Sequence, residues 1–131
     1  MKRAHISTGI LTLLAFLGTG MYMRVNFPEL YGDREAIRFL FRANHVYILF
    51  SALLNIMAGM IQHSPQQSGV LQKGDVPGSI AVLLSAPVFI AAFFLEPPEA
   101  SPMRPVTTAA AFLALVGVVL LVLARKDVWR R

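Results

Sequence analysis

The residues in this chain that are best suited to chemistry form a row that begins near Arg38 and continues into an apolar stretch. On a helix with about 100° per residue, the side chains of Arg34, Arg38, Arg42 and His45 fall within about 80° of one another, and Asn55 lies about 80° from His45. Such a row predicts an electropositive mouth for an anionic group, with Asn55 deeper along the same wall. Quinone or lipid headgroup binding would suit this wall, because quinone carbonyls accept hydrogen bonds and intramembrane polar residues are functional candidates.

The same row also suits helix packing, which is the interpretation that we favour. It continues through Ala52 and Gly59, and small residues let the backbones of membrane helices approach, while Asn or Ser side chains hydrogen-bond across helices. The arginines would then form a solvated face at the lipid headgroups, with Glu35 pairing with Arg38 at i,i+3. Matching faces occur in the first and last apolar stretches: Thr8, Thr12, Ala15 and Thr19, and Ala110, Ala114 and Gly117.

His5 and His63 are the candidates for haem ligation, since both are expected near the same end of the molecule. Axial ligation needs two imidazoles that face each other at similar depth, whereas histidines near a terminus or a loop edge are more often solvated. His45 does not pair with His63, because the two are 18 residues apart, about 27 Å along a helix. Four methionines offer copper ligands but are more typical of core filling: Met21, Met23, Met57 and Met60.

Four long apolar stretches must position these residues. The chain has 131 residues, of which 56% are hydrophobic and 15% are charged, whereas about 25% of the residues are charged in soluble domains. A helix needs about 20 apolar residues to cross a bilayer, and an isolated strand cannot satisfy its backbone there. The sequence therefore predicts an all-α membrane protein, a single domain of four antiparallel transmembrane helices over residues 6–23, 45–61, 78–95 and 106–124.

Helix is also expected before the second span. Asp33 is a plausible N-cap and no helix breaker follows it, so a helix over residues 34–61 would have 28 residues. It would measure about 42 Å, more than the ~30 Å hydrocarbon core. We expect the surplus to project from the membrane, or to bend at about Ala43 and lie along the surface, as an amphipathic extension whose Ile37, Leu40 and Phe41 face lipid or a neighbouring helix.

The distribution of cations predicts the orientation, because cytoplasmic loops carry an excess of Lys and Arg. With four spans, both termini and the middle loop share one side, which holds seven cations and two acids, against five and five on the other side. The formal charge of +5 therefore falls on one face, and both termini are expected in the cytoplasm, as in an inner membrane of bacterial type. We expect the first span to be an uncleaved signal anchor rather than a cleaved signal peptide.

Several function classes fit this sequence poorly. It shows no Gly-rich phosphate loop, nucleophile elbow, zinc-ligand spacing or pair of carboxylates on one helix face, and it has no Cys. The basic residues do not interleave with exposed aromatic residues, as nucleic-acid binding requires. The C-terminal RKDVWRR suits a membrane anchor instead, with Trp129 at the headgroup level. No internal repeat supports an inverted-repeat transporter.

Three functions are compatible with this pattern, and we favour the first. It is a non-enzymatic accessory or structural membrane protein that binds lipid, partner helices or a second copy through small-residue faces. The second is a quinone- or haem-binding redox accessory protein that uses the row from Arg38 to Asn55. The third is a small oligomeric transporter or channel subunit, in which the arginines line an anion path; the lack of acidic residues inside the spans disfavours cation export.

Overall fold

The structure, a computed structural model, describes residues 1–61, 75–99 and 103–124. Within these ranges the chain has no strand and forms four α-helices and one short 3₁₀ helix: α1 (Lys2–Leu30), α2 (Glu35–Ile61), α3 (Asp75–Leu95), η1 (Pro97–Glu99) and α4 (Pro105–Ala124). Each of the four α-helices is long and apolar enough to cross a membrane, and the most apolar 18 residues of each have a mean hydropathy between 1.5 and 2.7. The all-α fold with four membrane-spanning helices, predicted from the sequence, is confirmed.

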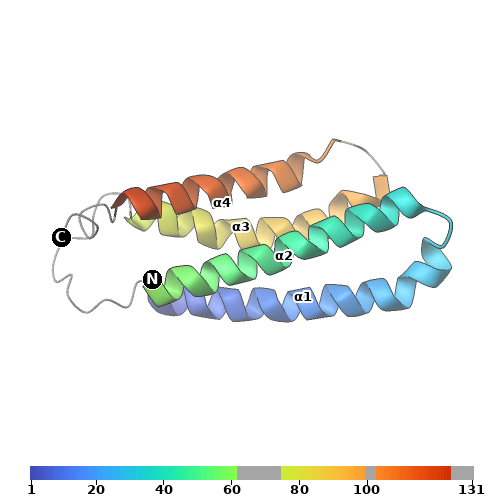
Figure 1. Cartoon of the computed structure of the whole chain (residues 1–131), viewed down its shortest axis with the longest axis horizontal. Coiled ribbons are helices and arrows are strands. Elements are labelled where there is room, and N and C mark those ends of the chain that lie inside the picture. The colour runs from blue at the N-terminus through green and yellow to red at the C-terminus, as the bar shows by residue number, and fades with distance from the viewer. Residues whose placement is uncertain (62–74, 100–102, 125–131) are drawn as a thin grey trace.

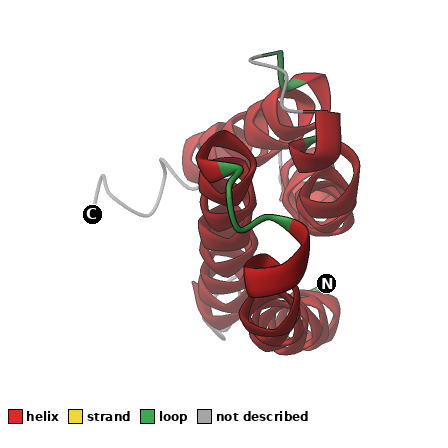
Figure 2. Cartoon of the chain, turned by 90° about the vertical axis from the view of Figure 1, so that its right-hand side faces the viewer, coloured by secondary structure: helices red, strands yellow, loops and turns green. Residues whose placement is uncertain are grey.

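The helices form two antiparallel hairpins. α1 packs against α2 and α3 packs against α4, and the hairpins meet mainly along α2 and α3. The helices therefore succeed one another in chain order across the bundle (Figure 1). α1 begins and α4 ends at one end of the bundle, whereas the α1–α2 turn and η1 lie at the other end, which faces the viewer in Figure 2. Many apolar side chains of α1 and α4 are exposed, on the surface that lipid would surround.

The first hairpin is longer than the second. α1 has 29 residues and α2 has 27, which correspond to about 43 and 40 Å. α3 and α4 have 21 and 20 residues and correspond to about 30 Å, so α1 and α2 project together beyond them (Figure 1). α2 runs through Ala43 as one helix, and α1 continues past residue 23 and through Pro28 before it ends.

The projecting part of α2 is the amphipathic extension that the sequence predicts. Ile37 and Phe41 are buried on one side of it, in the same core cluster as Phe27 near the end of α1. The Arg38 guanidinium lies 5.7 Å from the centre of the Phe27 ring and donates to the backbone oxygen of Gly32 at 3.3 Å. The extension thus packs on α1, the neighbouring helix.

Small residues bring the two helices of each hairpin into close contact. A Cβ atom at Gly117 of α4 would lie 2.9 Å from the backbone oxygen of Gly78 in α3, and one at Gly9 of α1 would lie 3.0 Å from the backbone oxygen of Ala52 in α2. Larger side chains at these crossings would force the backbones apart. The packing faces expected from the sequence are buried at Thr12, Thr19, Ala110, Ala114 and Gly117.

Candidate functional site

Asn55 lies in the interior of the bundle, where it connects three helices. Its amide nitrogen donates to the backbone oxygens of Ser51 at 3.0 Å and Val82 at 3.3 Å, and its Oδ1 lies 3.1 Å from Nδ1 of His5. Because the amide nitrogen already donates to two carbonyl groups, Oδ1 accepts, and His5 carries its proton on Nδ1. Asn55 therefore joins α2 to α1 and α3.

His45 makes a second polar contact between α1 and α2. Its Nδ1 lies 2.9 Å from the hydroxyl oxygen of Thr19, and this hydroxyl donates to the backbone oxygen of Phe16 at 2.9 Å. The Thr19 oxygen accordingly accepts from His45, which is protonated on Nδ1. The imidazole also stacks on the Phe16 ring, with 4.0 Å between the ring centres. His45 is thus held against α1 by both polar and aromatic contacts.

The four residues predicted to line one wall do not gather at a common site. Arg42 is exposed and Arg38 contacts Phe27 in the extension. His45 and Asn55 bond to two different residues of α1, which stand about 21 Å apart along that helix. The row follows one face of α2 but presents its members to different neighbours. Helix packing accounts for the contacts of His45 and Asn55.

Of the two haem candidates, His5 lies within the described residues, whereas His63 falls outside them, in the range 62–74. His5 is fully buried, and its Nε2 has no hydrogen-bond partner among the described residues. Since Nδ1 carries the proton, this Nε2 presents a lone pair. One histidine supplies one axial position, and bis-histidine ligation of haem needs two. Three of the methionines weighed as copper ligands are exposed: Met21, Met57 and Met60.

Replacing Asn55 with leucine should lower the free energy of unfolding by about 1–2 kcal/mol, because His5 loses its acceptor and two carbonyl groups each lose one of their donors in a buried setting. Thermal unfolding in a mild detergent measures this loss. Met57→Leu, on the exposed side of the same helix, is the control and should stay within about 0.5 kcal/mol of the original chain. Equal stability of the two variants would contradict the packing role of Asn55.

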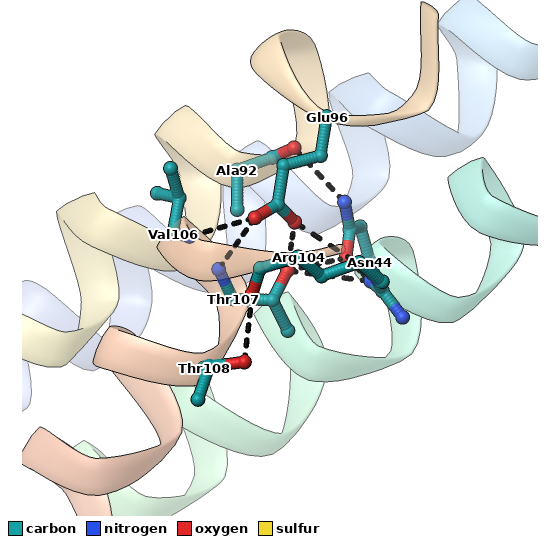
Figure 3. Close-up of polar contacts among 7 residues, drawn as sticks. All are labelled: Asn44, Ala92, Glu96, Arg104, Val106, Thr107 and Thr108. Carbon is teal, nitrogen blue, oxygen red and sulfur yellow. Dashed lines mark hydrogen bonds and ion pairs between the residues drawn. The ribbon is translucent and has the colours of Figure 1, made fainter. Parts of the chain in front are cut away.

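A second polar cluster lies at the end of the bundle where α3 ends and α4 begins (Figure 3). At its centre is Glu96, which is 6% exposed. Its Oε1 accepts hydrogen bonds from the backbone N–H groups of Val106 at 2.7 Å and Thr107 at 3.0 Å, and its Oε2 accepts from the Thr107 hydroxyl. Glu96 thus caps the first turn of α4, where the N–H groups lack helical partners and negative charge is favoured.

Arg104 completes this cluster. Its Nε lies 3.6 Å from Oε2 of Glu96, and its Nη2 donates to Oδ1 of Asn44 and to the hydroxyl oxygen of Thr107 at 3.3 Å. Asn44 is held in turn, because its amide nitrogen donates to the backbone oxygen of Ala92 at 2.9 Å. One ion pair and several hydrogen bonds therefore tie α2, α3 and α4 together (Figure 3). We call Asn44, Glu96, Arg104 and Thr107 the polar cluster.

An open groove of about 430 Å³ lies beside the polar cluster, between α2 and α4. Its lining changes from polar near the end of the bundle to apolar farther along α4: Tyr47, Arg104, Thr107, Thr108, Ala111, Phe112 and Leu115. The Arg104 guanidinium lies 5.7 Å from the centre of the Tyr47 ring, and Tyr47 stacks on Phe89 with 5.6 Å between the ring centres. This α2–α4 groove suits an elongated molecule with an anionic or polar end and an apolar remainder.

Reasoning from the sequence did not find the polar cluster. From the sequence alone, Glu96 and Arg104 enter only the sum of loop charges that predicts the orientation, and no role is predicted for Asn44. A signal does exist, because an acid directly follows one apolar stretch and a base directly precedes the next. A short connection makes the two helices antiparallel neighbours, and so it brings these two charges to the same end of the hairpin.

Metal ligands and known relatives give no further guide to the site. Within residues 1–61, 75–99 and 103–124, no three His, Asp or Glu side chains lie close enough together to hold a metal ion. No protein-family model, curated protein or solved structure matches the chain.

Proposed function

We propose that the chain is a non-enzymatic integral membrane protein that binds a lipid molecule in the α2–α4 groove, as an accessory or structural component of its membrane. The observation that carries this proposal is the place of Arg104, at the polar end of a groove whose remainder is apolar. A membrane lipid has the same order of polar and apolar parts. Four helices that are apolar enough to cross a membrane support a bilayer setting for this groove.

The other interior polar residues bond to neighbouring helices, and this supports a binding function rather than a catalytic one. A catalytic site needs an acid, a base or a nucleophile that can reach a substrate, whereas His45, Asn55 and Glu96 are hydrogen-bonded to neighbouring helices. Quinone binding along the row from Arg38 to Asn55 has less support for the same reason. The side-chain groups of His45 and Asn55 that would bond to a quinone already bond to α1.

A partner helix is the second candidate ligand. In the most apolar window of α1, 17% of the residues are buried, and a Cβ atom at Gly18 would meet nothing within 4 Å. An open small residue on an exposed apolar face suits contact with another membrane helix, including a helix of a second copy.

We also propose that both termini lie in the cytoplasm, at an inner membrane of bacterial type, because the excess of cations falls on their side. The chain has no Cys, so Asp33→Cys and Arg3→Cys each introduce a single thiol at an exposed position. In intact cells, an impermeant maleimide should label Asp33→Cys, and it should label Arg3→Cys only after permeabilisation. The opposite pattern would reverse the orientation.

Copurification tests the proposed function. The chain, extracted in a mild detergent, should retain bound phospholipid when measured by native mass spectrometry, and its absorption spectrum should show no Soret band. A Soret band, or a stoichiometric quinone, would replace the proposal with a redox role. A chain that emerges without lipid, alone or with a partner protein, would refute lipid binding.

A further inference from the structure

We propose that the α2–α4 groove selects an anionic phospholipid, which places its phosphate on Arg104 and one acyl chain along Ala111, Phe112 and Leu115. This inference rests on the proposed function and adds the class of lipid, its direction in the membrane and the residue that recognises its charge. Three observations support it: the length of the groove along α4, the charge at its polar end and the fixed position of the Arg104 guanidinium.

The groove has the length of one leaflet of a bilayer. Leu115 follows Arg104 by 11 positions, which is about 16 Å along a helix. Half of the ~30 Å hydrocarbon core is about 15 Å. Arg104 directly precedes α4, and Glu96 directly follows α3, so this charged pair stands where the apolar helices end. A lipid with its headgroup at Arg104 would therefore lay one chain along the groove down to about the membrane midplane.

The charge at the polar end of the groove favours an anion. Among the described residues that line the groove, Arg104 carries the only charge. Its partner Glu96 directs Oε1 to the first turn of α4, at 2.7 and 3.0 Å from two backbone nitrogens, and contacts Nε of Arg104 only at 3.6 Å. The N-terminus of α4 thus balances part of the Glu96 charge. Arg104 remains attractive to a phosphate. Because its Nη2 already donates to Asn44 and Thr107, Nη1 is the nitrogen that remains to donate charge-assisted hydrogen bonds to a phosphate.

The guanidinium of Arg104 is fixed before any ligand binds. Its Nη2 donates to Asn44, and the Tyr47 ring lies 5.7 Å away. A group that is already ordered loses less conformational entropy when a ligand arrives, which favours binding. Tyrosine is also typical of the membrane interface, where a phosphate would lie. Asn44 and Tyr47 are therefore positioning residues for Arg104.

Filling the groove is the first test. Ala111→Trp adds a large ring to the groove lining and leaves the polar cluster intact, whereas Ala109→Trp adds the same ring at an exposed position of α4 outside the lining. Each variant is reconstituted in nanodiscs of phosphatidylglycerol and phosphatidylcholine in equal parts, and the retained lipid is measured by native mass spectrometry. We expect Ala111→Trp to lose most of its bound phosphatidylglycerol and Ala109→Trp to match the original chain.

Changing the charge is the second test. Arg104→Gln should lower the preference for phosphatidylglycerol over phosphatidylcholine by about fivefold, because this is the gain in affinity that one cation near an anionic lipid contributes. Arg104→Lys should keep part of the preference, because it keeps the charge without the planar fork. Arg24→Gln, at an exposed position of α1 outside the groove lining, should leave it unchanged. Circular dichroism checks folding, and if Arg104→Gln does not fold, Arg104→Lys and Ala111→Trp decide the question.

The outcomes separate this inference from the function on which it rests. If the original chain retains both lipids equally and Ala111→Trp loses both, selection of an anionic lipid is overturned and lipid binding in the groove stands. If the original chain retains no phospholipid, or if Ala111→Trp and Ala109→Trp behave alike, lipid binding in the groove is overturned as well.

Discussion

Removal of the Glu96 carboxylate should lower the free energy of unfolding by about 3 kcal/mol, because a largely buried guanidinium loses its counter-ion and the first N–H groups of α4 lose their acceptor. Glu96 accepts from the backbone of Val106 and Thr107 and pairs with Arg104. Thermal unfolding of Glu96→Ala in a mild detergent measures the loss. Glu29→Ala, at an exposed position of α1, is the matched control and should change the stability by less than about 0.5 kcal/mol.

A double-mutant cycle separates the two roles of Glu96. In a chain that carries Arg104→Met, the further change Glu96→Ala removes the cap of α4 without unpairing a cation. We expect the ion pair to contribute a coupling energy of about 1–3 kcal/mol, because the two side chains share one buried network. If the coupling energy were near zero, and if Glu96→Ala lost no more stability than Glu29→Ala, the polar cluster would not hold the helices together as described.

Enlarging Gly117 should separate α3 from α4 and lower the free energy of unfolding by about 2 kcal/mol or more. A Cβ atom at this position would lie 2.9 Å from the backbone oxygen of Gly78 and 2.9 Å from the backbone nitrogen of Val82. Backbone atoms cannot move aside as a flexible side chain can, so Gly117→Ala is already unfavourable and Gly117→Leu more so. Thermal unfolding in detergent ranks the two variants against the original chain.

Gly18→Ala is the matched control for the Gly117 variants. A Cβ atom at Gly18 would meet nothing within 4 Å, and alanine is favoured over glycine in a helix by about 0.5–1 kcal/mol. Gly18→Ala should therefore leave the stability unchanged or raise it slightly. If Gly117→Ala raised the stability as well, α3 and α4 would not cross as closely as described.

The spans and the packing faces follow from the sequence because they depend on local properties of the chain. Apolar length predicts each span, and small residues at helical spacing predict the buried positions Thr12, Ala110 and Gly117. The first span is predicted over residues 6–23, and the helix that contains it, α1, continues beyond this range to Leu30. Arg24 ends the apolar stretch without ending the helix, because backbone hydrogen bonding continues outside the hydrocarbon core.

The polar cluster depends on contacts between distant residues, which no single stretch of sequence reveals. Asn44 and Arg104 are 60 positions apart and meet only because the two hairpins pack together. Helical periodicity likewise places His45 and Asn55 on one face of α2 but does not identify the α1 residues opposite them. What the sequence presents as one wall is, in the bundle, two separate contacts between helices.

Protection of the exposed apolar side chains by lipid is the claim on which the function depends. Leu14 of α1 and Leu84 of α3 are 58% and 50% exposed, and the chain has no Cys, so Leu14→Cys and Leu84→Cys each provide one thiol. In detergent-free membranes opened to both sides, a water-soluble maleimide should react with the turn variant Asp33→Cys and leave Leu14→Cys and Leu84→Cys unmodified. Rapid reaction of either leucine-site thiol in the same membranes would contradict the four-span arrangement.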